Sequence, residues 1–295
     1  MNLKETVKSK LDSTLKYIFE TEDKLIVEFS YINKNDGKDI ICIPSQSMCN
    51  LACKFCHTTD YIGMIRNRNL SVDEIIFGVN FIINELDIKN HDRVLLISWM
   101  GCGEPILNVD NVIDSMVLFK RLEEKGFSYV RFAIATSIPK SKWINFYKLV
   151  EGIKKNNLPV KLHLSLHYTM DIQRKEWMPS SLDIMSSLSA VDFYKKLTKN
   201  PVEIHYTLIE GVNDTEQDAI LLSTFLKDKD FNVKFLFYNE KPSIDFHASS
   251  KEKLKIFKRY FDKYNIDNEY YIPPGLDIGA SCGQFLLDYY IKNQK

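Results

Sequence analysis

The segment Cys49-Asn50-Leu51-Ala52-Cys53-Lys54-Phe55-Cys56 carries three cysteines at C-x3-C-x2-C spacing, directly after a short strand-like run. From this run onward, strand-like and helix-like stretches alternate along the chain. The strand-like stretches cover residues 39–43, 94–98, 129–135, 160–166, 202–208 and 232–238. The helix-like stretches that follow them cover residues 71–86, 109–125, 141–156, 183–199, 214–228 and 250–264. Regular alternation predicts a parallel sheet with right-handed crossovers, and six such units predict a partial (β/α)6 barrel of the α/β class.

The residues before the barrel show two further patterns. Apolar residues recur at helical spacing at Leu3, Val7, Leu11, Leu15 and Ile18, so we expect an amphipathic helix over residues 3–20. Two strand-like runs, 25–32 and 40–43, flank the turn-forming residues Asp36 and Gly37 and predict a hairpin. We therefore expect an extension at residues 1–37, made of a helix and a hairpin, before a barrel domain at residues 38–295.

The composition is that of an ordinary globular protein with enough length for a large core. Thirty-nine basic and 39 acidic residues give a formal net charge of zero, so bulk charge offers no argument for nucleic-acid binding. No apolar stretch approaches the length of a membrane span, and the charged start lacks the apolar core of a signal peptide. We expect a cytoplasmic protein, in which six cysteines are better explained as metal ligands or reactive thiols than as disulfides.

Three closely spaced thiolates suit an iron–sulfur cluster. Without a fourth cysteine, Cys49, Cys53 and Cys56 would leave one iron of a 4Fe-4S cluster open, and that iron can chelate the amino and carboxylate groups of S-adenosylmethionine (SAM). One electron from the cluster would then cleave SAM to a 5′-deoxyadenosyl radical. The alternative is a structural zinc site, which needs four ligands; His57 is the available fourth. Phe55 and the six strand–helix units favour the cluster.

In parallel barrels, chemistry takes place at the carboxyl ends of the strands. Polar and glycine-rich segments follow the predicted strands at these ends: Gly101-Cys102-Gly103-Glu104-Pro105, Thr136-Ser137, Ser165-Leu166-His167 and Asn239. We expect SAM to be bound by side chains and backbone from this set: Gly103, Glu104, Thr136, Ser137, Ser165, His167 and Asn239.

From about residue 26 to 287, the sequence resembles the RlmN/Cfr-type radical SAM RNA methyltransferases. The resemblance rests on these segments: Cys42-Ile43-Pro44-Ser45-Gln46-Ser47-Met48-Cys49, Arg68-Asn69-Leu70-Ser71, Gly103-Glu104-Pro105-Ile106-Leu107-Asn108, Ser165-Leu166-His167 with Arg174 and Met178-Pro179, Gly211-Val212-Asn213-Asp214, Tyr238-Asn239 and Asp277-Ile278-Gly279-Ala280-Ser281-Cys282-Gly283-Gln284. It implies a radical SAM barrel, the two cofactors above, and an adenine-containing substrate, by default ribosomal or transfer RNA. It also implies a flavodoxin- or ferredoxin-type electron donor.

Three features depart from the family pattern. Only about 25 residues precede the hairpin, where the family has a longer accessory domain that helps to grip RNA. Cys102 stands where the family usually has methionine, and His205 where it usually has glutamate. The short N-terminal part leaves a smaller substrate open, such as a nucleotide or an adenine-containing metabolite. A radical SAM enzyme without methyl transfer and an iron–sulfur redox sensor are the remaining alternatives.

By resemblance, three further residues carry the methyl transfer. Carbon 2 or carbon 8 of adenine is too electron-poor to attack the methyl group of SAM, so the family uses a methylcysteine, here Cys282. A second SAM supplies the radical that activates this methyl group for addition to the ring. Cys42 matches the thiol that resolves the covalent adduct through a disulfide, and Glu28 matches the base that removes the ring proton.

Several other polar residues have ordinary explanations. We expect Cys102 to pack beside SAM, and His163 and His205 to be barrel-interior or surface residues. Phosphate binding and ordinary salt bridges are equally open for Arg66, Arg68 and Arg174.

Overall fold

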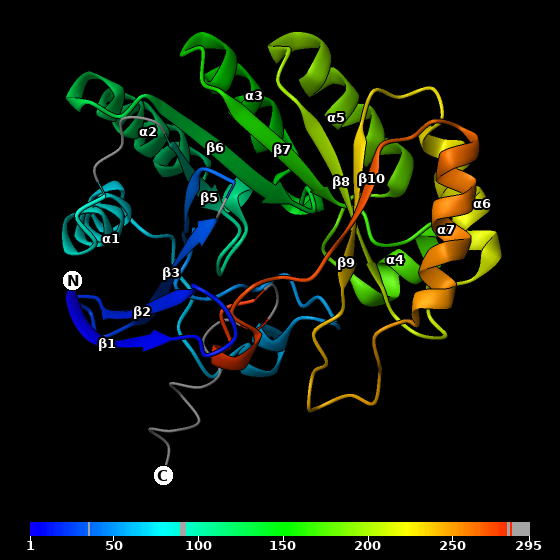
Figure 1. Ribbon diagram of the computed structural model, residues 1–295, viewed down its shortest axis with the longest axis horizontal. Coiled ribbons are helices and arrows are strands. Elements are labelled where there is room, and N and C mark those ends of the chain that lie inside the picture. The colour runs from blue at the N-terminus through cyan, green and yellow to red at the C-terminus, as the bar shows by residue number, and fades with distance from the viewer. Residues whose placement is uncertain (35, 89–92, 282–283, 285–295) are drawn as a thin grey trace.

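The computed structural model describes residues 1–34, 36–88, 93–281 and 284, and within them ten strands form one sheet in sequence order (Figure 1). The strands are β1 (Asn2–Lys8), β2 (Leu15–Glu20), β3 (Ile26–Lys34), β4 (Lys38–Cys42), β5 (Val94–Trp99), β6 (Tyr129–Thr136), β7 (Val160–Ser165), β8 (Val202–Leu208), β9 (Asn232–Phe237) and β10 (Asn268–Tyr271). Strands β1 to β4 pair antiparallel, and β4 to β10 pair parallel. The predicted hairpin and all six predicted strand–helix units are confirmed.

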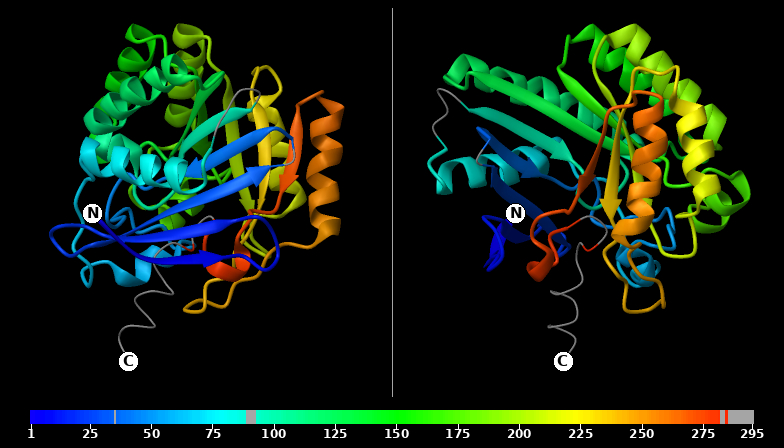
Figure 2. Two further views of the ribbon diagram at one scale, coloured as in Figure 1. Left: turned by 60° about the vertical axis from the view of Figure 1, so that its left-hand side comes forward. Right: turned by 45° about the vertical axis from the view of Figure 1, so that its right-hand side comes forward.

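Helices line the outer side of the curved sheet (Figures 1 and 2). The α-helices are α1 (Val72–Glu85), α2 (Val109–Lys120), α3 (Ile144–Lys155), α4 (Asp171–Trp177), α5 (Ile184–Thr198), α6 (Glu216–Leu226) and α7 (Lys251–Lys263). The short 3-10 helices are η1 (His57–Tyr61), η2 (Pro105–Asn108), η3 (Arg121–Lys125), η4 (Lys140–Lys142) and η5 (Leu276–Ile278). In the part of the chain that the structure describes, no helix combines the length and apolar character needed to cross a membrane.

Alternation along the strands separates an apolar outer face from a more polar inner face. On β3, Val27 and Phe29 belong to the main core, and the ring of Phe29 packs where α1 carries Gly78. On the same strand, Ser30 and Ile32 line a cavity inside the barrel. Because successive side chains on a strand point to opposite faces, Glu28 shares the inner face with Ser30.

The expected helix over residues 3–20 is wrong, because this segment forms the antiparallel pair β1 and β2. Two of the residues that suggested a helical stripe, Leu3 and Leu11, are exposed. The turn between the strands is made by polar side chains: Asp12 Oδ1 accepts a hydrogen bond of 2.8 Å from the Thr14 amide. Turn chemistry and the aromatic run in β2 therefore outweigh the helical spacing. The domain boundary after residue 37 stays a prediction.

The chain after β10 crosses back to the first turn of the protein (Figure 1). Asp277 accepts hydrogen bonds of 2.7 Å from the Ser9 hydroxyl and 2.7 Å from the Lys10 amide. The Gly275 amide donates to Asp12 Oδ2 at 2.8 Å. These contacts fix the segment after the last strand against the β1–β2 turn, across the inner side of the sheet.

Candidate active site

A cavity of about 190 Å³ lies at the carboxyl ends of the parallel strands. All three cysteines of the C-x3-C-x2-C loop line it, together with every residue that we expected at the SAM site: Gly103, Glu104, Thr136, Ser137, Ser165, His167 and Asn239. The structure thus brings together, from the ends of five strands (β4, β5, β6, β7 and β9), the predicted cluster ligands and the predicted SAM contacts.

The geometry of the cysteine loop does not suit a single zinc ion. Sulfur ligands of one zinc ion lie about 3.8 Å apart, as bonds of about 2.3 Å require. Among the described residues, the only group of three potential metal ligands within 4.8 Å of one another is a different one, at His163, Glu203 and His205. The proposed fourth zinc ligand, His57, instead places Nε2 3.4 Å from the Asn239 carbonyl oxygen. At least one pair of the three cysteine sulfurs is therefore more than 4.8 Å apart, which fits a multi-iron cluster better than a single zinc ion.

Burial makes the three thiols poor acids on their own. It raises the pKa of Cys49 to about 12 and raises the pKa of Cys53 and Cys56 as well. The charged form of a buried thiol is stable only beside a compensating positive charge. A cationic iron centre bound by these sulfurs would supply that charge, so the donor set fits the expected cluster.

The loop after β5 packs tightly on the chain that leaves β4. The Ser45 amide donates to the Cys102 carbonyl oxygen at 2.9 Å, and the Glu104 amide donates to Gln46 Oε1 at 3.0 Å. Gly103 has a φ of +104°, and a Cβ atom there would lie 2.5 Å from Ser45 Oγ. Only glycine therefore fits at this position, which sets the course of the loop along the cavity.

The Glu104 carboxylate joins two strand ends. It accepts hydrogen bonds of 3.1 Å from the Ile106 amide and 3.1 Å from the Ser137 amide. Burial raises the pKa of Glu104, and the hydrogen bonds from Thr136 and Ser137 only partly oppose this rise. The carboxylate thus holds the loops after β5 and β6 together.

Arg174 has a structural role, and its contacts are those of neither a phosphate-binding residue nor an ordinary salt bridge. Its side chain is buried, and its guanidinium donates to the carbonyl oxygens of Ser165, Leu166, Leu182 and Ser137. It therefore satisfies carbonyl groups at the ends of β6 and β7, where SAM contacts are expected.

His167 is held in a specific orientation beside the cavity. Its backbone has a φ of +57°, and its Nδ1 accepts a hydrogen bond of 3.0 Å from the Thr207 amide. The Phe55 ring contacts the imidazole edge-on, with the ring centroids 5.2 Å apart. Sequence reasoning missed Thr207 and Ala135, which also line this cavity. Their inward position on β8 and β6 follows from strand alternation once the register is known.

Cys42, Cys49 and Cys102 share one small apolar cluster with Met48 and Ile18. Cys42 ends β4 and lines a second cavity, of about 450 Å³, inside the barrel. Cys102 lines the cavity with the cluster cysteines, as expected of a residue beside SAM.

Glu28 is buried, on the inner face of β3, and its Oε1 lies 3.7 Å from Nζ of the equally buried Lys16. Its side chain therefore lies inside the barrel. The structure places Cys42 near the cluster ligands, and Glu28 on the inner face of the neighbouring strand.

Cys282 lies outside the described residues. The residues before it are described: Ala280 lines the same 450 Å³ cavity as Cys42, and the Ser281 hydroxyl donates to the Pro274 carbonyl oxygen at 2.6 Å. The chain leading to Cys282 therefore passes along the cavity that Cys42 faces.

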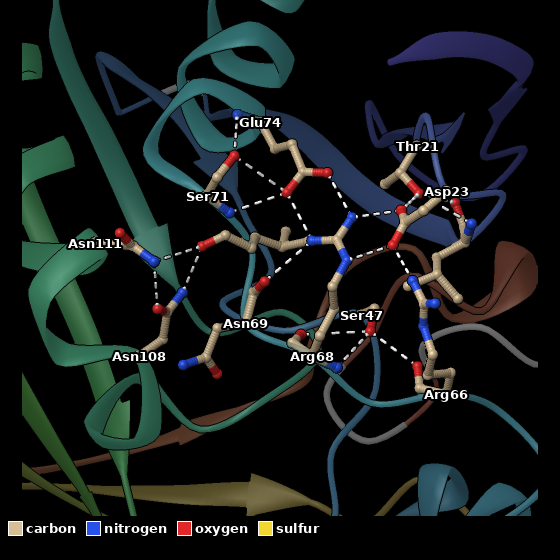
Figure 3. Close-up of polar contacts among 12 residues, drawn as sticks. Thr21, Asp23, Ser47, Arg66, Arg68, Asn69, Ser71, Glu74, Asn108 and Asn111 are labelled. Carbon is tan, nitrogen blue, oxygen red and sulfur yellow. Dashed lines mark hydrogen bonds and ion pairs between the residues drawn. The ribbon is translucent and has the colours of Figure 1, made fainter.

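Arg66 and Arg68 form salt bridges within the protein (Figure 3). Arg68 donates to both carboxylate oxygens of Asp23 and both of Glu74, at 2.6 to 2.8 Å. Arg66 also pairs with Asp23. Since Glu74 caps α1 together with Ser71, this network ties the β2–β3 turn to the start of α1 and leaves phosphate binding by Arg68 unsupported.

No family model matches the sequence. Curated relatives do: a "Probable dual-specificity RNA methyltransferase RlmN" of Petrotoga mobilis is 33% identical over 281 residues, which cover 94% of this chain and 76% of the relative. A protein of the same name from Lachnoclostridium phytofermentans is 31% identical over 289 residues, which cover 97% and 76%.

Among solved structures, a radical SAM methyltransferase from Sphaerobacter thermophilus superposes with a TM-score of 0.82 at 25% identity, over 96% of this chain and 80% of the other. SuiB of Streptococcus suis, solved with SAM bound, gives a TM-score of 0.57 at 14% identity over 81% of this chain and 51% of its own, a likeness of fold.

Proposed function

This chain belongs to the RlmN family of radical SAM methyltransferases, and on that premise we propose that it methylates a carbon atom of an adenine ring in RNA. The methylated atom is carbon 2 or carbon 8. The observation that carries this proposal is a pair of cavities that share the lining residues Met100, His205 and Leu236. One is lined by the three cysteines and the polar strand ends, the other by Cys42 and Ala280.

A 4Fe-4S cluster and SAM are the cofactors of this enzyme class, and together they supply a 5′-deoxyadenosyl radical on one-electron reduction. In the proposed site, Cys49, Cys53 and Cys56 hold the cluster. The backbone at Gly103 and the fixed loops around Glu104 position SAM. The remaining contacts come from the ends of later strands: Thr136, Ser137, Ser165, His167 and Asn239.

Cys282 carries the methyl group. Cys42 releases the product by attacking the Cys282 sulfur, so that a Cys42–Cys282 disulfide forms while the bond from that sulfur to the transferred carbon breaks and the carbon takes a proton. The shared cavity of Cys42 and Ala280 supports this pairing. Glu28 takes the ring proton, and the Nζ atom of Lys16 lies 3.7 Å from its carboxylate. A flavodoxin- or ferredoxin-type protein supplies the electron.

Peptide mapping tests the methyl-carrier role. Protein purified from cells, or incubated with SAM and a reductant, should carry one added methyl group on Cys282. The Cys53→Ala variant should lose the iron of the reconstituted cluster, about four per chain, together with this methyl group. A Cys282 that stays unmodified in cluster-loaded protein would contradict the proposed route.

A further inference from the structure

A polar group inside the barrel has no part in the proposed methyl transfer. Register brings His163 of β7 opposite Glu203 of β8, with His205 two residues further along β8. All three side chains are buried. His163 and His205 line the 450 Å³ inner cavity, and His205 also lines the cavity that holds the cluster cysteines.

The three ligand atoms form a nearly equilateral triangle. His163 Nδ1 lies 2.9 Å from His205 Nε2 and 3.0 Å from Glu203 Oε1, and His205 Nε2 lies 3.2 Å from the same oxygen. With metal–ligand bonds of about 2.0–2.1 Å, neighbouring ligands lie about 2.9 Å apart in octahedral and about 3.4 Å apart in tetrahedral coordination. The observed distances fall within this interval, so one ion could bind all three atoms without rearrangement.

Hydrogen bonds alone explain the triangle poorly. A ring nitrogen of a neutral imidazole is either a donor or an acceptor. One proton on either nitrogen leaves the other nitrogen facing the carboxylate oxygen as a second acceptor, and a proton on both would set two N–H groups against each other at 2.9 Å. No protonation state therefore makes hydrogen bonds of all three contacts. Two imidazole nitrogens and one carboxylate oxygen are the donor set of many catalytic zinc and non-haem iron sites.

Two lysines form salt bridges with Glu203 and place positive charge next to the site. Lys161 pairs with Glu203 Oε2, the oxygen outside the triangle, and so fixes the carboxylate for binding through one oxygen. Lys234 lies 2.9 Å from Glu203 Oε1 and also 2.9 Å from Glu269 Oε1. Because Glu269 is a second partner, Lys234 can keep a salt bridge when an ion takes Oε1.

We propose that His163, Glu203 and His205 bind a divalent transition-metal ion, as a second metal site distinct from the cysteine cluster. The two histidines face the inner cavity, so the remaining coordination positions open into it. There the ion can take water or an oxygen of a molecule bound in the cavity.

Zinc is the probe that separates this site from the iron cluster. The full-length, cluster-loaded protein is dialysed against a chelator, incubated anaerobically with ZnCl2 and desalted, and its zinc is measured by mass spectrometry. We expect about one zinc ion per chain. Zinc-edge X-ray absorption should show imidazole and oxygen ligands and no sulfur.

Matched variants locate the ion. His163→Gln and His205→Gln should each reduce bound zinc from about one to near zero per chain, with cluster absorbance unchanged. The control is His247→Gln, because His247 is an exposed histidine 3.2 Å from Glu240 and 3.3 Å from Asp245. This control should keep the zinc.

Three results overturn the proposal: no zinc bound to the wild-type protein, zinc retained in both buried variants, or sulfur ligation in the absorption spectrum. If circular dichroism shows that a buried variant has not folded, the zinc-edge X-ray absorption spectrum of the wild-type protein alone decides whether the two histidines and Glu203 bind the ion. Because zinc content is read without methylation, the outcome is independent of the proposed function.

Discussion

Nζ of Lys16 lies 3.7 Å from Oε1 of Glu28, and both side chains are buried on the inner face of neighbouring strands. A buried carboxylate of this kind keeps its charge only beside a cation. The pair therefore links the folding of the N-terminal strands to the residue that we propose as the base.

Replacing Lys16 with Met should lower the free energy of unfolding by about 3–5 kcal/mol, because it removes the cation that lies 3.7 Å from a buried carboxylate. Lys16→Met combined with Glu28→Gln should recover most of this loss. Chemical denaturation of the two variants makes the comparison. If the single and double variants are equally stable, the ion pair does not have the role that we assign to it.

Gly103→Ala should weaken SAM binding at least tenfold, about 1.4 kcal/mol. The added Cβ would lie 2.5 Å from Ser45 Oγ and 2.7 Å from the Gln46 nitrogen, so the loop must move. The control is Gly211→Ala. Gly211 also has a positive φ, of +69°, but no atom lies within 4 Å of the position that the added Cβ would take. Calorimetric titration with SAM should show near wild-type affinity for the control, and equal loss in both variants would contradict the packing argument.

Glu74→Gln should lower the free energy of unfolding near neutral pH by about 1–2 kcal/mol, through the cap of α1 and the Arg68 pair. Burial alone would raise the pKa of Glu74, but hydrogen bonds from Arg68 and Ser71 outweigh it and lower the pKa below 4.5. A lowered pKa in the folded state means that the carboxylate stabilises the protein above about pH 4.5 and loses this effect as the pH falls through the folded value. The difference from wild type, measured by denaturation between pH 7 and pH 3, should therefore shrink on acidification.

Much of the fold could be predicted because its pattern is local. The strand–helix alternation and the cysteine spacing are visible in short windows, and the strand ends they define do meet at one cavity. The β1–β2 pair could not be predicted from spacing, since Leu3 and Leu11 match a helical stripe yet are exposed. The His163–Glu203–His205 group depends on the register between β7 and β8, which no local pattern specifies.

Cys42→Ala should trap the enzyme on its substrate. The cluster and the methylation of Cys282 should remain, because Cys42 neither binds the cluster nor accepts the methyl group. The covalent link from the Cys282 sulfur through the transferred carbon to the adenine ring should persist, because no thiol is there to break it. Denaturing gels before and after nuclease treatment would show RNA attached to the protein, and mass analysis would identify the adduct. Normal turnover without a trapped species would remove Cys42 from the mechanism.

Nucleoside analysis of RNA tests the central claim most directly. Total RNA from cells that express the wild-type protein, and from cells that express Cys282→Ala, is digested and examined by mass spectrometry against standards methylated at each position of adenosine. We predict methyladenosine modified on carbon 2 or carbon 8 with the wild-type protein and its loss with the variant. Equal amounts of carbon-methylated adenosine in both samples, or none in either, would contradict the account.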